Sequence, residues 1–512
     1  TAIDQTVYMV TNVQTDLPGL VDTCLLILHD WSSFIALEDE EIDNERGVIL
    51  EEERTTGGAN RRVMETLLPK MYPGSPYGER LPIGTREVIA NFSYQDLRDY
   101  YHKWYRPDLQ GIIVVGDIDV DAIEARIKEM FADIPAPVNP AERTQFMIED
   151  NAEPIVAVAS DAELTSYQLS IYNKHEATPD SLKNDLNYWM AEYILSLISQ
   201  MQINRLQELV QKPNPPFVYG YSYYGDYYVA PTKEAWTSMA VANGVDGIDD
   251  AMTALVTENK RMQQYGFTAS EYERAKADFM KSIESAYNER NNTENSKYFN
   301  ACLDHFLTNE PMMGIEMEYQ LYQQIIPNLP LEAINQFASQ LIKNDNLVIT
   351  LSAPKKDGET LPTEEELLAM YNNANAMEVE PYQEEVFDGP IVPELPKPGT
   401  VKKETTNETF GTTEWTLSNG MKVIYKQTDF KEDEIRMSAY SPGGLTALPQ
   451  DDPYTLQVLG DIITLGGVGE FSAIDLPKVL AGKKVSVSPY ISTYSEGMSG
   501  SCSPKDLETM LQ

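Results

Sequence analysis

The sequence predicts an α+β protein built from several domains, and three observations support this. At 512 residues the chain is too long for one hydrophobic core, since domains average about 150 residues. β-rich runs alternate with long stretches of helical periodicity along the chain. The chain also begins on AIDQTVYMVTNVQTDLPGLVDTCL and ends on STYSEGMSGSCSPKDLETMLQ, which share the order strand, short turn, helix start. That shared order indicates an internal repeat.

The first predicted domain covers residues 1–145. Its opening, TAIDQTVYMVTN, alternates in the manner of a strand, and GIIVVGDID (Gly111–Asp119) has the pattern of a buried strand closed by a turn. IPAPVNP ends the domain. Helices are predicted at 17–37, at 38–68 with an interruption near Gly57-Gly58, in the stretch that ends in YYHKWYRPD, and at 120–132.

The second predicted domain covers residues 150–378. Its predicted strands are Ile155–Val158, Tyr167–Tyr172, Tyr219–Val229, Trp236–Ala242 and Leu347–Ala353, and its long helices are 181–211, 247–265 and 269–307. Residues 379–410 are rich in Pro and Glu without a sustained period, which predicts a linker. A third domain, residues 411–512, opens on WTLSNGMKVIYKQ, where Asn419-Gly420 is a hairpin turn signal.

The charge of the chain excludes some classes of function. A formal net charge of −41 argues against nucleic acid as a partner, because phosphates must be neutralised by clustered Lys and Arg. It argues equally against binding to anionic membrane surfaces, and no apolar run is long enough to predict a membrane span. Such a balance suits cationic peptides or metal ions, and it also serves plain solubility.

The cysteines predict neither a metal site nor a disulfide framework. Cys24, Cys302 and Cys502 are far apart, form no CxxC spacing and are odd in number. Each lies among residues typical of a half-buried helix or strand, so we expect three small buried side chains.

One crowded acidic helix has a pattern that suggests chemistry. Nine of the sixteen residues from Glu38 to Glu53 are acidic. Within ERGVILEEER, Glu45, Val48, Ile49 and Glu52 form an i, i+3, i+4, i+7 stripe, the spacing of a core-facing surface. We therefore expect this stripe to point inward, with a carboxylate at each end. A buried carboxylate is costly unless it is paired or bound to a metal.

On the same helix Glu51 and Glu53 project about 100° to either side of Glu52, and we expect them to face solvent. Their number is then explained as an ordinary solvated acidic surface. Glu52 is the one carboxylate of the three that the pattern selects.

Four ordered stretches resemble the pitrilysin/insulinase family of zinc metallopeptidases, the HxxEH or inverzincin class. They are EEIDNERGVILEEER, YPGSPYGERLPIGT, LRDYYHKWYRPDLQGIIVVGDID and, in the third domain, LSNGMKVIYK. The resemblance runs across essentially the whole chain. It implies homologous α+β domains, each an antiparallel-rich sheet packed against helices, arranged as two halves that close around a chamber.

The resemblance also implies a metal site. The family binds Zn²⁺ through both histidines of HxxEH and a distal glutamate in a pattern E-R followed, after five residues, by E. Here that pattern is Glu45-Arg46 … Glu52, which implies Glu52 as the metal ligand and Glu45 as the supporting residue behind it. The HxxEH glutamate is the family's general base, and peptide substrates add as a strand to an edge that Thr1–Tyr8 would continue here.

This sequence departs from the family in one respect, because it contains no HxxEH. The four histidines, His29, His102, His175 and His305, are far apart, and none forms the i, i+4 pair of a metal-binding helix. We expect packing roles for them, with His29 and His305 on helices and His175 in a loop.

Two explanations of the missing motif stay open. We favour a first domain truncated at its N-terminus, with HxxEH upstream of Thr1, and a third domain truncated at its C-terminus. Thr455–Gly467, which would correspond to the motif helix in the third domain, has no histidine, as in the family's degenerate half. On this interpretation the 512-residue fragment is itself inactive and associates with its complementary half or another subunit.

The alternative is a non-catalytic family member that acts as a structural or partner-binding subunit. An unrelated acidic scaffold protein is a further alternative, and it requires the four ordered stretches to be coincidence. Neither the compartment nor the substrate is fixed by these residues.

Overall fold

The computed structural model describes residues 1–343, 345–384, 389–448, 458–460, 462–463 and 465–512. These residues fall into two compact units. Unit 1 comprises Thr1–Phe267, Glu294–Met312 and Glu332–Pro381, and unit 2 comprises Thr268–Thr293, Met313–Leu331 and Tyr382–Gln512. The domain boundaries predicted from the sequence stay a prediction, and each unit is described by itself.

The N-terminal part of unit 1 is helical. Its helices are α1 (Leu20–Ser33), α2 (Asp39–Thr56), α3 (Ala59–Met71), α4 (Arg86–Asn91), α5 (Tyr94–Trp104) and α6 (Val120–Met130). The predicted break at Gly57-Gly58 lies between α2 and α3. Gly57 leaves little room there, because a Cβ at this position would lie 2.9 Å from the backbone oxygen of Glu53.

Two strands predicted in this part are wrong. Neither residues 1–12 nor Gly111–Asp119 form a strand, and among the described residues neither segment pairs with another strand. Tyr8 and Met9 are 45% and 60% exposed, and Gly111 and Ile112 are exposed as well. The alternating pattern is present in the sequence, but a strand also requires a hydrogen-bonded neighbour, which these segments lack in the described chain.

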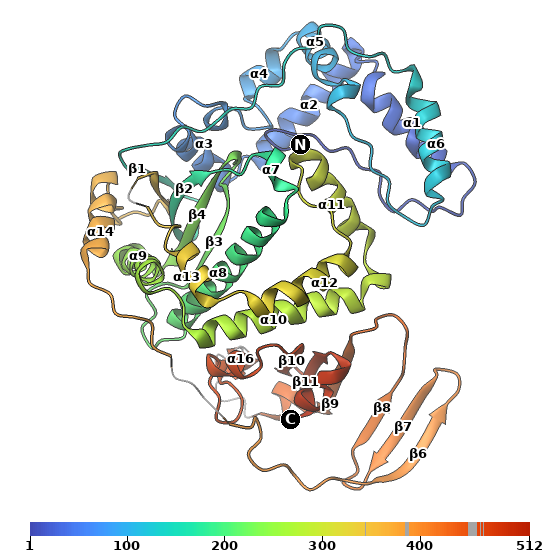
Figure 1. The fold of residues 1–512 in the computed structure, drawn as a ribbon, viewed down its shortest axis with the longest axis vertical. Helices are drawn as coiled ribbons and strands as arrows, with labels where there is room; N and C mark the ends of the chain where they lie inside the picture. Colours follow the sequence, from blue (N-terminus) through green and yellow to red (C-terminus); the bar gives the residue numbers. More distant parts are fainter. Residues whose placement is uncertain (344, 385–388, 449–457, 461, 464) are drawn as a thin grey trace. The chain divides into compact units, whose positions relative to one another are not determined.

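A five-stranded sheet forms the centre of unit 1, and all five strands predicted for residues 150–378 are confirmed (Figure 1). The strand order is β1-β5-β2-β4-β3, in which β1 and β5 are parallel and the other pairs are antiparallel. The strands are β1 (Ile155–Asp161), β2 (Tyr167–Glu176), β3 (Tyr219–Tyr227), β4 (Ala230–Ala242) and β5 (Leu347–Pro354).

The other helices of this part of the chain follow in sequence order. They are α7 (Asp180–Lys183), α8 (Leu186–Val210), α9 (Ile248–Tyr265), α11 (Asn295–Thr308), α13 (Leu331–Ala338) and α14 (Glu364–Ala376). The long helix predicted at 269–307 is divided, because a 3₁₀ turn at Arg290–Asn292 separates α11 from α10 (Ala269–Asn288) of unit 2.

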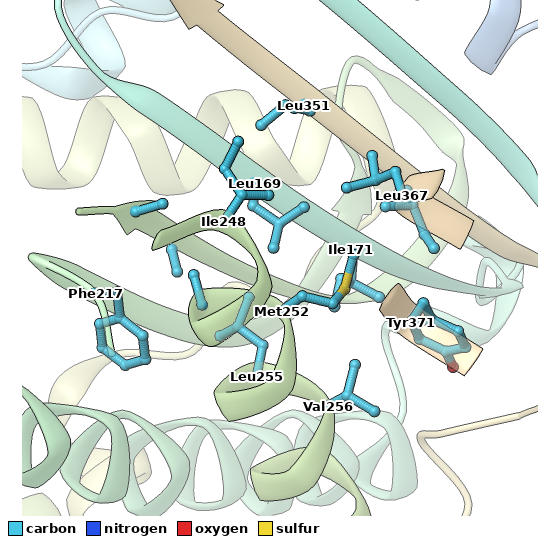
Figure 2. Close-up of a cluster of buried hydrophobic side chains, with 14 of the residues drawn as sticks. Leu169, Ile171, Phe217, Ile248, Met252, Leu255, Val256, Leu351, Leu367 and Tyr371 are labelled. Atoms are coloured by element: carbon cyan, nitrogen blue, oxygen red, sulfur yellow. The ribbon is translucent and has the colours of Figure 1, made fainter. Parts of the chain in front are cut away.

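One face of the sheet carries the larger core. Leu169 and Ile171 of β2 pack with α9, α14 and the odd-numbered residues of β5. Figure 2 shows side chains of α9, among them Met252 and Leu255, directed toward this face of the sheet. Because side chains of a strand alternate between its two faces, β5 supplies Leu347–Ala353 at every second position to this core and Val348 to the other.

The opposite face carries a second core that holds α3. Leu68 and Met71 at the end of α3, each 1% exposed, pack with Ala157 of β1, Tyr172 of β2 and Val348 of β5. The helix that follows the acidic helix α2 is therefore anchored on the central sheet.

Unit 2 contains two smaller sheets. The predicted hairpin at Asn419-Gly420 is confirmed as β7 and β8, and Gly420 has a positive φ of 90°. Residues 401–407 were predicted to lie in a linker but form β6, which pairs with β7. The elements are α10, α12 (Ile315–Ile325), β6 (Val401–Asn407), β7 (Thr412–Leu417), β8 (Lys422–Tyr425), β9 (Ile435–Pro442), α16 (Asp475–Val479), β10 (Val485–Ile491), β11 (Ser495–Cys502) and α17 (Leu507–Leu511).

The second small sheet has the order β10-β11-β9 and is antiparallel. The predicted strand, turn and helix start at the chain end are confirmed in β11 and α17. In Thr455–Gly467, predicted to correspond to the motif helix, residues 455–457, 461 and 464 lie outside the described residues, and the described residues 458–460, 462–463 and 465 are helical. No helix in the described part of the chain is both long and apolar enough to cross a lipid bilayer.

Candidate metal-ligand helix

The acidic helix α2 is fixed at its centre by Arg46. Its guanidinium donates to the carbonyls of Ile89 at 2.7 Å and Phe92 at 2.6 Å, at the C-terminal end of α4, where a helix leaves carbonyls without internal partners. Arg46 Nε also donates to Asp43 at 3.1 Å, and Asp43 accepts from Tyr94 at 2.6 Å. These hydrogen bonds, first that of Tyr94 and then that of Arg46, hold the pKa of Asp43 below its usual range.

This anchor sets the face that α2 presents to the protein. Ile42 is buried, and Arg46, Ile49 and Glu53 are half-buried, so the packed stripe runs i, i+4, i+7, i+11. The prediction that Glu45, Val48, Ile49 and Glu52 form the inward stripe is therefore wrong. The face that packs against the protein includes Arg46, which binds the carbonyls at the end of α4. Glu45 and Glu52 are exposed instead.

Glu53, predicted to face solvent, is the inward carboxylate of the three. Its side chain is 19% exposed and lies 3.8 Å from Arg61 and 3.2 Å from Arg86. Glu51 is exposed as predicted and pairs with Arg54 at 2.6 Å on the same helix. The burial cost of Glu53 is met by two guanidinium groups, as ion pairing requires.

Glu45 and Glu52 share the exposed face of α2 with Val48, which is 56% exposed. Neither carboxylate forms a hydrogen bond or an ion pair with another residue that the structure describes. Their roles as metal ligand and supporting residue stay predictions. What the structure adds is that both carboxylates are free to meet a partner on one face of a fixed helix.

The described residues alone do not make a zinc site. Among them, no group of three or more His, Cys, Asp or Glu side chains could hold a metal ion. A catalytic zinc site needs three protein ligands and an open position. Glu52 has the right chemistry for one of the three, since carboxylate oxygen is an accepted zinc ligand.

Packing roles were predicted for the four histidines, and three of them contact other groups of the protein. His29 is buried in α1 with Nε2 2.9 Å from Asp133. Burial lowers its pKa, but the hydrogen bonds that its ring donates to Asp133 and Asp30 outweigh this, so the pKa is raised. His305 in α11 contacts a backbone carbonyl at 2.8 Å, and His102 is exposed. His175 was predicted in a loop but lies in β2, where its Nε2 is 2.9 Å from a backbone carbonyl and burial lowers its pKa.

The cysteines are free, and only Cys502 is fully buried. Cys24 and Cys302 are half-buried, so the expectation of three small buried side chains holds fully for one of them.

Sequence reasoning missed the residues that hold the α2–α3 pair in place. Tyr72, after α3, donates to the carbonyl of Tyr227 at 2.5 Å. Arg62 of α3 pairs with Asp161 at the end of β1. No local signal marks these contacts, because the paired residues lie 155 and 99 positions apart. Arg46 could have been found, since an arginine four residues after the buried Ile42 falls on the packed stripe.

Comparison with known proteins shows which proteins this chain is similar to. The sequence model described as the peptidase M16 inactive domain matches residues 91–279, a range that begins after α2. "Zinc protease PQQL-like" of Arabidopsis thaliana is 29% identical over 476 residues, 92% of this chain and 46% of that protein. "Probable zinc protease PqqL" of Escherichia coli K12 is 26% identical over 501 residues, 96% of this chain and 52% of that protein.

A solved structure of a PqqL protease has a similar fold. The crystal structure of the periplasmic protease PqqL from Escherichia coli superposes with a TM-score of 0.65 at 22% identity, over 97% of this chain and 54% of that one. The chain therefore spans about half the length of the curated relatives that it matches. The four motif stretches, the fold and these relatives agree in one similarity: the chain resembles the M16 peptidases, the pitrilysin/insulinase family.

Proposed function

We propose that this chain is part of a zinc-dependent metalloendopeptidase in which Glu52 supplies one metal ligand. The observation that carries the proposal is the exposed, unpaired Glu52 carboxylate on a helix that Arg46 holds in place. The relatives named zinc proteases support the metal and the reaction class. Zn²⁺, when bound, lowers the pKa of a bound water and polarises a scissile carbonyl.

The other two ligands would be the histidines of an HxxEH motif that these 512 residues do not contain. Glu45 lies seven residues before Glu52 on the same face of α2. At that distance its carboxylate supports the site by charge and orients its neighbours rather than binding the metal itself.

The substrates proposed are peptides or unfolded polypeptides, cleaved inside a chamber that two family halves enclose. A strongly acidic protein attracts cationic segments, which raises their association rate at low salt. Cleavage of a lysine-rich and a glutamate-rich peptide at rising ionic strength tests this, and equal rates at every salt concentration would refute it.

A second candidate function is a non-catalytic family member that binds a partner or its complementary half. One observation favours it: the matched family model is of the inactive type. In that case the intact protein does not contain zinc in a fixed molar ratio to protein.

One experiment separates the two. Zinc content and peptide cleavage are measured for the intact protein and for Glu52→Gln, which removes the charge of the carboxylate without changing its size. The proposal expects zinc and activity to be lost together. Glu51→Gln is the matched control, because Glu51 lies on the same helix and pairs only with Arg54 among the described residues.

A further inference from the structure

The C-terminal end of α2 is held by a residue outside it. α2 ends at Thr56, and the carbonyl of Gly57, the next residue, accepts from Arg62 Nη1 at 2.7 Å. Glu52 lies five residues before Gly57, about 7.5 Å along the helix axis at 1.5 Å per residue. The position of this end therefore sets the position of the carboxylate.

Arg62 reaches the central sheet with the rest of its guanidinium. Nε and Nη2 donate to the two oxygens of Asp161 at 2.6 and 2.7 Å, and Nη2 also donates to Glu163 at 2.5 Å. This two-pronged arrangement fixes direction as well as distance, and lysine cannot reproduce it.

Asp161 is itself fixed. It ends β1, its carboxylate accepts from the backbone N–H of Glu163 at 3.0 Å, and its carbonyl accepts from the N–H of Lys355 at 3.0 Å. The hydrogen bonds from Arg62, and then that of Glu163, lower the pKa of Asp161 to about 2, so the carboxylate is charged at neutral pH.

We propose that Arg62 is a positioning residue: it ties the end of α2 that carries Glu52 to the Asp161 turn of the central sheet. The position of Glu52, in the N-terminal helical part of unit 1, is then set by the five-stranded sheet of the same unit. This inference rests on the proposed function only for the importance of Glu52, and the contact itself is tested separately.

The first test is hydrogen–deuterium exchange of the intact protein. In Arg62→Lys, amides at the end of α2, residues 53–58, are expected to exchange at least tenfold faster, because one ammonium cannot serve Gly57 and Asp161 together. Amides at the buried end of α3, around Leu68, keep their rate because their packing is unchanged. Arg54→Lys is the control, since Arg54 is exposed and, among the described residues, forms its ion pair with Glu51 of the same helix. Unchanged exchange at residues 53–58 would overturn the inference.

A second variant guards against misfolding and tests the pairing. Asp161→Asn keeps the side-chain shape and is expected to give the same local increase. The double variant Arg62→Lys/Asp161→Asn should be no worse than either single one, because both remove the same link. Additive effects would contradict a shared link.

The third readout is zinc affinity, measured by competition with a chromophoric chelator. Arg62→Lys should lower it about 10- to 100-fold, the usual effect of a residue that orients a ligand, with Glu52→Gln lowering it further. Lowered affinity in Glu52→Gln alone overturns the positioning role and leaves the proposed function standing. Unchanged affinity in Glu52→Gln overturns the proposed function, and the exchange result then decides what Arg62 does to α2.

Discussion

Tyr72 joins α3 to the central sheet, and removing its hydroxyl is the sharpest stability test that the fold offers. The side chain is 1% exposed, its hydroxyl donates to the carbonyl of Tyr227 at 2.5 Å, and it accepts from the N–H of Val229 at 3.2 Å. In Tyr72→Phe the ring stays in its core while both backbone groups lose a partner.

The magnitude follows from burial. Tyr227 is 0% exposed and pairs with Ala230 across the β3–β4 hairpin, so its carbonyl loses one hydrogen bond, whose net contribution is about 0.5–1.5 kcal/mol. Val229 is half-buried, so its N–H recovers part of its loss from solvent. We expect a local cost of about 2 kcal/mol, which corresponds to about 30-fold faster opening of α3.

Hydrogen exchange of the α3 amides measures this directly, without assuming that a chain with two compact units unfolds in one step. Tyr100→Phe is the matched control, because Tyr100 is 59% exposed and its hydroxyl is free to bond with water. If α3 exchanges at the same rate in Tyr72→Phe as in Tyr100→Phe, then the hydroxyl does not anchor α3 and the docking argument fails.

Further predictions concern α2 and α1. Arg46→Ala leaves the carbonyls at the end of α4 unpaired and should speed exchange at the centre of α2 at least tenfold, whereas Gly47→Ala, at an open position, should not. Gly57→Ala places a Cβ 2.9 Å from the backbone oxygen of Glu53 and should lower the midpoint temperature of thermal unfolding. An unchanged midpoint in Gly57→Ala would contradict this. His29 has a raised pKa in the folded state, so its ion pairs stabilise fully below its ordinary pKa, and that stability is lost as pH rises through the folded value. Thermal unfolding between pH 6 and 9 should show this loss in the native protein and not in His29→Gln.

The elements with local signals could be predicted from the sequence. The strands of the central sheet follow their period of two, since Leu347, Ile349 and Leu351 all enter one core while Val348 enters the other. Gly57-Gly58 marked a helix break, because glycine is a poor helix former. Asn419-Gly420 marked a hairpin, because its turn requires the positive φ that Gly420 adopts.

The features that depend on distant residues could not be predicted. Residues 1–12 alternate correctly, yet no strand forms without a neighbouring strand in the described chain. The rotation of α2 is set by carbonyls 43 and 46 residues from Arg46, so a stripe drawn from the helix alone was out of phase. The Arg62–Asp161 pair spans 99 residues, and nothing in either neighbourhood indicates the other.

For the candidate site, the sequence identified the helix but not its surroundings. The pattern from Glu45 to Glu52 selects two carboxylates on one helical face, and the structure places both on one exposed face rather than inside. The inward partner of the arginines is Glu53. An arginine counts as polar in a periodicity argument, although its long stem and fork fill packed positions well.

The central claim is that Glu52 binds zinc in the intact protein, and the zinc-to-protein ratio of Glu52→Gln tests it most directly. Glu52→Gln, the control Glu51→Gln and the native protein are purified separately in the same way. Their metal content is measured by mass spectrometry after dialysis without chelator. The account predicts about one zinc per chain in the native protein and in Glu51→Gln, and a loss of most of it in Glu52→Gln. Zinc retained at the native ratio in Glu52→Gln would contradict the account.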